Sequence, residues 1–332
     1  MSILLIGDPH FKVDNGRETS LMSLKICEYA AKIKPRIIVV LGDILDRHEK
    51  IHVAPLGRSI LFLSQLVKIA PLFVVIGNHD RPNNSAFLTD DHPFVSLKLW
   101  NNTFVIDKPY VHQLDDLKIL LVPYVPPGRF QEAINTINTD LKSIDLIFAH
   151  QEFKNAKMGA IKSVIGDPWS LENPMIFSGH IHEYDELQSN IIYTGTPMQT
   201  CFGDTSEKTV SVIDIKSDRK WSHRRFNLGL PRKRIYRVNY NDFDTFTITE
   251  SKDDTIKVVI SGPTSSHKSI MNSIKVKTWI SQGIKVCYKT TSESTVSNIP
   301  DIITVKFSQL LYNFCKDNND LMIAYKHALQ SN

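Results

Sequence analysis

The stretch PLFVVIGNHD, residues 71–80, runs from a short apolar segment straight into a glycine and three polar residues. Its apolar part is brief and rich in bulky aliphatic residues, which is typical of a strand buried on both faces of a sheet. The glycine lets the backbone turn sharply and approach a small ligand closely. Asn78, His79 and Asp80 are therefore expected at the mouth of a buried strand.

Four more apolar segments end in polar residues. Residues 2–6 lead into GDPH, residues 36–41 into GDILDR, residues 145–149 into HQE and residues 175–178 into GHIH. Ligand-bearing loops of an open α/β sheet lie at the carboxyl ends of its strands, so we expect these polar ends to meet. The candidate site residues are Asp8, His10, Asp43, Asn78, His79, Asp80, His150, His180 and His182.

Helical patterns separate the first strands. A helix capped by Thr19 or Ser20 is predicted to end before Pro35, and apolar residues at helical spacing predict another near residues 56–69. This alternation of strands and helices indicates a layered α/β sheet with right-handed crossovers. Residues 191–215 are expected to continue as an antiparallel meander.

Composition indicates a soluble, intracellular protein, without distinguishing cytoplasm from nucleus. The chain has 332 residues, of which 42% are hydrophobic and 22% charged, as in ordinary globular proteins. No segment approaches the roughly 20 apolar residues that span a bilayer, and the N-terminus does not resemble a signal peptide. The four cysteines lie far apart without a C-x-x-C pair, which favours free thiols in a reducing compartment.

Positive charge gathers in the C-terminal third. From residue 225 onward, 15 Lys and Arg stand against 9 Asp and Glu, although the net charge of the whole chain is only +4. Residues 224–237 hold six basic side chains and no acidic one. They could contact a polyanion, but a solvated linker between domains explains them equally well. The candidates for contact with a polyanion are Arg224, Arg225, Arg232, Lys233, Arg234 and Arg237.

The donor types at the strand ends suit metal ions. Asp, Asn and His provide the oxygen and imidazole ligands preferred by manganese, iron or zinc, and no thiolate is among them. Leaving His79 and Asp80 aside, seven candidate ligands are too many for one ion, whereas a carboxylate can bridge two. Two divalent ions about 3.5–4 Å apart can assist an in-line displacement at phosphorus. Each motif alone could be an ordinary turn, but their joint occurrence favours a site.

The motifs resemble the signature of the calcineurin-like metallophosphoesterases, over residues 3–215. In order along the chain they are D-x-H, G-D-x-x-D-R, G-N-H-D, a lone downstream His and G-H-x-H. Residues 193–204, YTGTPMQTCFGD, are further similar to the SbcD-type DNA repair nucleases, and a viral or phage version is compatible with these motifs. The resemblance implies a layered βαββαβ sandwich with a small α+β capping domain and a C-terminal helical tail.

The same resemblance implies three domains. Residues 1–224 would form the metallophosphoesterase nuclease domain, and residues 225–290 a capping and DNA-binding domain with a helix near residues 268–281. Residues 291–332 would form a linker and a helical tail that binds a partner. The apolar stripe at residues 307–325 is a dock for that partner or a helix packed on its own domain.

Roles for individual residues also follow from the resemblance. His79 would contact the scissile phosphate and assist the leaving oxygen, oriented by Asp80. Asp46 stands where SbcD-type nucleases often carry a histidine, and His48 follows two residues later, so a second phosphate-contacting histidine is not assigned. One metal would be held by Asp8, His10, Asp43 and His182, and the second by Asp43, Asn78, His150 and His180, with Asp43 as the bridge.

The implied activity is that of a manganese-dependent DNA nuclease, with Mg²⁺, Fe²⁺ or Zn²⁺ as alternative metals. It would act as a 3′→5′ exonuclease on duplex DNA and as an endonuclease on single strands, in DNA end processing, recombination and repair. The sequence has no G-x-x-x-x-G-K-[ST] motif, so the resemblance implies a separate SbcC-type coiled-coil ATPase subunit. It also implies a homodimer through helices near residues 56–69 and 85–99, and no membrane partner.

Two other functions remain open. A phosphomonoesterase, or a cyclic-nucleotide or protein phosphatase of the same superfamily, would use a similar metal centre. Protein phosphatases generally have G-N-H-E where this chain has G-N-H-D, and they lack the segment at residues 193–204. A non-catalytic scaffold for the ATPase is the second alternative, and the complete set of ligands argues against it.

Overall fold

The three-dimensional structure is a computed structural model. It describes residues 1–48, 50–159, 161–216, 218, 220–249, 253–291, 315–316 and 321–322. Most of the predicted partner-binding tail, including nearly all of the stripe at residues 307–325, lies outside the described residues.

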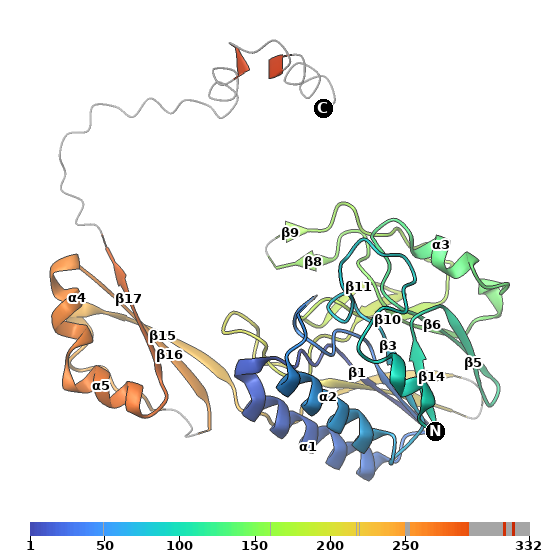
Figure 1. Cartoon of the computed structure of the whole chain (residues 1–332), viewed down its shortest axis with the longest axis horizontal. Helices are drawn as coiled ribbons and strands as arrows, with labels where there is room; N and C mark the ends of the chain where they lie inside the picture. The colour runs from blue at the N-terminus through green and yellow to red at the C-terminus, as the bar shows by residue number, and fades with distance from the viewer. Residues whose placement is uncertain are drawn as a thin grey trace.

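Two six-stranded sheets form the N-terminal part of the molecule (Figure 1), with strand orders β14-β13-β1-β2-β3-β4 and β11-β12-β10-β7-β6-β5. In the first sheet β1 to β4 are parallel, and in the second β6, β7, β10 and β12 are parallel. This α/β arrangement confirms the predicted fold class. The strands of the first sheet are β1 (Ser2–Ile6), β2 (Ile37–Val40), β3 (Leu72–Val75), β4 (Thr103–Ile106), β13 (Val210–Ile215) and β14 (Trp221–Phe226). Those of the second are β5 (Tyr110–Leu114), β6 (Leu117–Val122), β7 (Leu146–His150), β10 (Met175–Gly179), β11 (Asp185–Gln188) and β12 (Ile191–Tyr193).

Helices α1 (Gly16–Ile33) and α2 (Val53–Leu66) cover the outer face of the first sheet. α1 begins before Thr19 and Ser20, the two predicted caps, and its N-cap is Asn15. Thr19 lies inside the first turn, where its hydroxyl donates to the carbonyl of Asn15. It ends before Pro35, as predicted. Shorter elements are α3 (Phe130–Asn135), β8 (Lys157–Met158), β9 (Ile161–Lys162) and the 3-10 helices Val13–Asn15, Val95–Leu99 and Leu141–Ser143.

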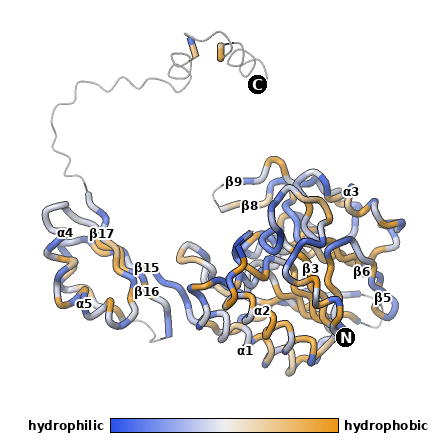
Figure 2. The backbone as a smooth tube through the Cα atoms, in the orientation of Figure 1, coloured by the Kyte–Doolittle hydropathy of each residue, from blue (hydrophilic) through white to orange (hydrophobic). Residues whose placement is uncertain are grey.

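Alternate residues of β1 face opposite sides of their sheet. Ile3 and Leu5 join the apolar core between the two sheets, whereas Leu4 and Ile6 pack on the side of α1 and α2. The central strands are therefore buried on both faces, and they appear as hydrophobic tubes inside the sandwich in Figure 2. Polar residues can enter this layer only where the strands end, which places them at one edge of the sandwich.

The predicted helix near residues 85–99 is wrong. Only the 3-10 helix Val95–Leu99 forms there. The carboxamide oxygen of Asn83 accepts the backbone N–H groups of Ser85 and Ala86, which closes a turn, and Pro93 interrupts any helix that would continue. One of the two helices expected at a dimer interface is therefore absent.

The predicted meander over residues 191–215 is also wrong. β12 lies in the second sheet, parallel to β10, while β13 lies in the first sheet, antiparallel to β1. The segment between them crosses from one sheet to the other, and Gly195 takes a left-handed conformation at the crossing with φ of 69°. This crossing brings residues 194–209 past the polar edge of the sandwich.

A third sheet follows, formed by the parallel strands β15 (Lys233–Asn239), β16 (Thr255–Gly262) and β17 (Lys285–Thr290), with a 3-10 helix at Tyr240–Asp242. Two helices, α4 (Thr264–Met271) and α5 (Ile274–Ser281), replace the single predicted one, because the hydroxyl of Ser273 caps a new helix by accepting the N–H of Val276. This part has its own apolar core, and β14 runs through the boundary predicted at residue 224. Among the described residues, no helix has the length and apolar character needed to cross a membrane.

Candidate metal centre

The predicted site residues meet at the carboxyl ends of strands from both sheets. Asp8, Asp43 and Asn78 follow the neighbouring strands β1, β2 and β3 of the first sheet. His150 ends β7, and His180 directly follows the adjacent strand β10 of the second sheet. Since the sheets pack face to face, loops more than 100 residues apart in the chain bring their polar side chains together in one mostly buried cluster, which we call the pocket. Two groups of potential ligands result.

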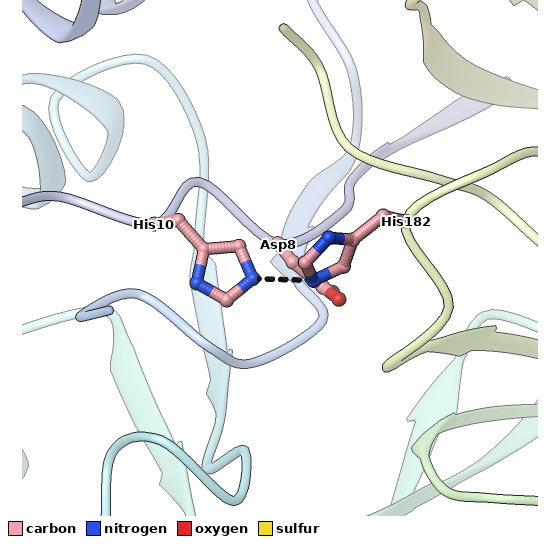
Figure 3. A group of neighbouring side chains, drawn as sticks. All are labelled: Asp8, His10 and His182. Atoms are coloured by element: carbon pink, nitrogen blue, oxygen red, sulfur yellow. Dashed lines mark hydrogen bonds between the residues drawn. The ribbon is translucent and has the colours of Figure 1, made fainter. Parts of the chain in front are cut away.

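The first group contains Asp8, His10 and His182, whose ligand atoms all lie within 4.8 Å of one another (Figure 3). Nε2 of His10 is 2.9 Å from Nε2 of His182. Two imidazole nitrogens at this distance must share either a proton or a cation. One oxygen of Asp8 accepts the N–H of His180 at 2.8 Å, while its other oxygen, Oδ1, is buried without a hydrogen-bond partner among the described residues.

The second group contains Asp43, His150 and His180, and Asn78 joins it. The carboxamide oxygen of Asn78 lies 3.0 Å from Nε2 of His150 and 2.9 Å from Nδ1 of His180. Nδ1 of His150 lies 2.7 Å from the carbonyl of Leu41 and donates its hydrogen there, which orients the ring with Nε2 facing the pocket.

Asp43 faces both groups. Its Oδ1 lies 3.4 Å from Nε2 of His150, and its Oδ2 lies 3.9 Å from Nε2 of His10. The carboxylate is buried, and Oδ1 also accepts the N–H of His79 at 2.8 Å. Asp43 therefore lies between the two groups, where the predicted bridging residue is expected.

The backbone around these ligands is strained. His10, Asp43 and His180 all have positive φ, at 46°, 46° and 83°, a conformation that costs a residue with a side chain on the order of 1–3 kcal/mol. Hydrogen bonds between the loops hold it in place: the N–H of His10 donates to the carbonyl of Asp43, and that of His180 donates to Asp8. The strain turns each side chain inward at the point where its strand ends.

Two motif glycines are required by close approach between loops. A Cβ on Gly77 would overlap the backbone and carboxylate of Asp43, and a Cβ on Gly179 would overlap the carboxylate of Asp8. The glycine before a ligand thus makes room for the ligand of another loop.

Burial dominates the electrostatics of the pocket. It raises the pKa of Asp8 well above the usual range, against the opposing effect of His150, and the charge of Asp43 raises it further. Burial also lowers the pKa of His10 to about 3. Burial alone would lower the pKa of His150, but Asp43 and Asp8 raise it to about 9. Two buried carboxylates close together favour a bound cation, because unpaired buried charge is costly.

The residues present fit two divalent cations. Buried polar atoms are normally paired, so the unpartnered Oδ1 of Asp8 indicates a ligand position. The donors are carboxylate, carboxamide and imidazole, which suit manganese, iron or zinc. The first group holds three of the four residues expected for one ion, Asp8, His10 and His182, and the second holds three of the four expected for the other, Asp43, His150 and His180. Asn78 lies beside the second group, and Asp43 lies 3.9 Å from His10 of the first.

His79 lies beside the pocket and is not oriented by Asp80, so that expectation is wrong. Nδ1 of His79 lies 2.7 Å from the carbonyl of Asp46. The carboxylate of Asp80 instead accepts the backbone N–H groups of Ile44, Leu45 and Gly77, because its buried position faces the turns after β2 and β3. Burial and the charge of Asp43 raise its pKa to about 6. Asp80 thus ties two ligand loops together.

Sequence reasoning missed Glu152 near the pocket and assigned no role there to Asp46 or His48. Oε2 of Glu152 lies 3.8 Å from Nε2 of His180, the nitrogen that faces away from Asn78. Oδ1 of Asp46 lies 3.6 Å from Nδ1 of His10. The ring of His48 stacks on that of His79, with 4.5 Å between centroids. The position of Glu152 two residues after His150 was the available signal for its role.

The six basic candidates for DNA contact do not form one free surface. Arg224 pairs with Asp214, and the guanidinium of Arg225 stacks on the ring of Tyr184 at 3.8 Å. Lys233 pairs with Glu18, and Arg234 pairs with Asp254. Arg232 and Arg237 are exposed.

Comparison with known proteins agrees with this geometry. The family model described as calcineurin-like phosphoesterase matches residues 1–184. The chain is 37% identical over 303 residues to "Putative phosphoesterase 078R" of Invertebrate iridescent virus 3, covering 90% of this chain and 87% of that protein. It is 38% identical over 271 residues to "Putative phosphoesterase 244L" of Invertebrate iridescent virus 6, covering 80% and 96%. The solved structure of Yfce, a phosphoesterase from E. coli, covers 69% of this chain and 100% of its own at 13% identity, with a TM-score of 0.34.

Proposed function

The chain belongs to the calcineurin-like phosphoesterase family, whose members hydrolyse phosphoesters with divalent metals, and on this premise we propose that it is a manganese-dependent DNA nuclease. The observation that carries the proposal is Asp43, which faces two separate donor groups. DNA as the substrate is supported by the likeness of residues 193–204 to SbcD-type nucleases. The proposed action is 3′→5′ exonuclease cleavage of duplex DNA and endonuclease cleavage of single strands, in end processing, recombination and repair.

The chain's own residues would hold and orient the reacting groups. When bound, two divalent cations polarise the phosphoryl oxygens and lower the pKa of the attacking water. Asp43 holds the two donor groups at a fixed separation, so that a phosphodiester bound between them would contact both groups. The strained loops keep the ligands preorganised, so little reorganisation is needed during the reaction.

In this proposal His79 assists the leaving group. Its side chain is 31% exposed, and Nε2 lies 4.0 Å from Oδ2 of Asp43, at the edge of the pocket. In the protonated ring both nitrogens are donors. Nδ1 stays on the carbonyl of Asp46 while Nε2 gives its proton to the departing ribose oxygen.

A direct test compares end-labelled duplex DNA, single-stranded DNA and 4-nitrophenyl phosphate as substrates with Mn²⁺. We expect both DNA forms to be cut, chelation to stop the reaction, and Mn²⁺ to restore it better than Mg²⁺, Fe²⁺ or Zn²⁺. Rapid hydrolysis of the monoester with intact DNA would instead support a phosphomonoesterase, or a cyclic-nucleotide or protein phosphatase. Inactivity on all three with metals bound would support a scaffold.

Partners are proposed on the same resemblance. An SbcC-type coiled-coil ATPase would supply nucleotide hydrolysis. A homodimer would use α2, on which Val53 and Leu61 are exposed apolar residues two turns apart. Light scattering of the purified chain and of a Leu61→Glu variant tests the dimer: a dimer that persists in the variant would contradict this interface.

A further inference from the structure

The sheet of β15, β16 and β17 has two unlike faces. Its strands are parallel and in register, so residues paired across them point to the same side. One side carries Val238, Val258 and Ile260, which are buried against α4 and α5. Those helices lie on the side of the sheet away from the sandwich (Figure 1). The other side, which we call the open face, carries Arg237, Lys257, Val259, Lys285, Cys287 and Lys289.

The open face is positively charged. Lys257 and Lys285 are paired neighbours on adjacent strands, and Arg237 and Lys289 lie further along the same side. None of these four forms an ion pair with the part of the chain that the structure describes, and none of the residues of β15, β16 or β17 is acidic. Like charges side by side in a sheet repel one another, so this arrangement is costly unless a polyanion is bound.

An aromatic side chain faces one end of this surface. The amino groups of Lys233, Lys257 and Lys285 lie 6.0, 5.9 and 5.7 Å from the ring centre of Phe202. Phe202 is half-buried. Lysines around an aromatic ring can neutralise phosphates while the ring stacks on a base.

The loop that carries Phe202 is attached to the metal centre. The carbonyl of Thr200 accepts the amino group of Lys12, two residues beyond His10. The N–H of Thr205 donates to Glu183, the residue after His182. At its other side, Gln199 exchanges two hydrogen bonds with the backbone of Lys233 at the start of β15. Phe202 therefore lies between the ligands and the open face.

We propose that the open face and Phe202 bind a single-stranded segment of DNA and guide it to the metal centre. This inference rests on the proposed nuclease function. The lysines would contact successive phosphates, and Phe202 would stack on an unpaired base beside the pocket. Three of the six basic residues that the sequence singled out, Arg224, Lys233 and Arg234, form ion pairs within the chain. Lys257, Lys285 and Lys289 lie in a segment without a charge run and were not among the six.

The test measures binding of a labelled single-stranded oligonucleotide by fluorescence anisotropy, with the full chain in EDTA so that cleavage cannot interfere. In the variant Lys257→Gln/Lys285→Gln, we expect the slope of log affinity against log salt to fall by about 1.4, for two lost phosphate contacts. Phe202→Ala should weaken binding on the order of tenfold with an unchanged slope, because stacking is not electrostatic.

A matched control changes two lysines of the same domain on the other side. Lys268 in α4 and Lys277 in α5 are exposed, and Lys268→Gln/Lys277→Gln removes the same charge. This control should bind the oligonucleotide like the unchanged chain. Circular dichroism melts of all variants verify that each is folded.

Cleavage separates this inference from the proposed function. With Mn²⁺, the ratio of DNA cleavage to hydrolysis of bis(4-nitrophenyl) phosphate should fall in the open-face and Phe202 variants. If the unchanged chain cuts DNA but these variants bind and cut like the control, the open-face inference is wrong and the nuclease function stands. If the unchanged chain hydrolyses the small ester but neither binds nor cuts DNA, both are overturned.

Discussion

The two donor groups of the metal centre differ in how their imidazoles are held. In the second group, Nδ1 of His150 is fixed by the carbonyl of Leu41 at 2.7 Å, whereas Nε2 of His180 has no hydrogen-bond partner among the described residues and lies 3.8 Å from the carboxylate of Glu152. In the first group, Nδ1 of His10 has no hydrogen-bond partner among the described residues, and Asp46 lies 3.6 Å away. An imidazole whose far nitrogen is held binds a cation with less loss of freedom. We therefore expect the second group to bind its ion more tightly than the first.

The largest effect is expected from removing what the two groups share. Asp43→Asn takes away the carboxylate that faces both, so both ions should bind more weakly and hydrolysis should fall by at least a factor of about 100. Metal content by mass spectrometry and titration calorimetry with Mn²⁺ measure this directly. Loss of one ion with normal binding of the other would contradict the bridging role.

His79→Asn should leave both groups intact and slow the reaction on the order of 10²–10⁴-fold, the range of a missing general acid. The ring lies beside the ligands rather than among them, so Mn²⁺ stoichiometry should stay unchanged. Rates on DNA and calorimetric stoichiometry on the same preparation provide the test. An unchanged rate would remove His79 from the mechanism.

Glu152→Gln tests the difference between the groups. The amide no longer offers a charged acceptor to His180, so affinity at the second group should fall roughly 10- to 100-fold while the first is unaffected. Asp46→Asn is the matched change beside His10, and it should have a smaller effect because the side chain of Asp46 is 27% exposed, whereas that of Glu152 is 12% exposed. Equal losses in the two variants would show that the groups are held alike.

The smallest effect is expected at a cluster of polar side chains outside the metal centre, whose members form hydrogen bonds with one another and need no metal ion. Burial would raise the pKa of Asp107, but hydrogen bonds from His92 and Lys98 lower it below the usual value. A depressed folded-state pKa means that this contribution to stability is present above the ordinary pKa of about 3.9 and is lost as pH falls through the lower folded value. Asp107→Asn should cost about 1–2 kcal/mol at pH 7 and progressively less below pH 4.

Thermal melts with and without Mn²⁺ complete this comparison. Cations that bind only the folded chain raise its melting temperature. Asp107→Asn should lose the same stability under both conditions, because Asp107 lies outside both donor groups. A loss that appears only with Mn²⁺ would connect this cluster to the metal centre.

Much of the fold and the metal centre could be predicted from the sequence. Short apolar segments such as residues 36–41 and 71–76 are recognisable as buried strands, and in an α/β sheet the polar residues after such strands must gather at one edge. The predictions that failed depended on local capping or on distant packing. Ser273 divides one expected helix in two, and Asn83 with Pro93 replaces another by turns.

The sequence by itself determined which donor residues follow the strands of this protein and in what order these residues occur along the chain. The spacing of the glycines and the apolar character of the short strands are local properties, so they can be recognised in the sequence. Only the tertiary structure decided that Asp46 rather than Asp80 holds His79, that Glu152 faces His180, and that lysines from β16 and β17 share a face with Phe202. The lysines approach Phe202 from a sheet, whereas Phe202 lies on a loop between the other two sheets. All these contacts join residues from separate turns and strands, so they exist only after the strands have paired and the sheets have packed.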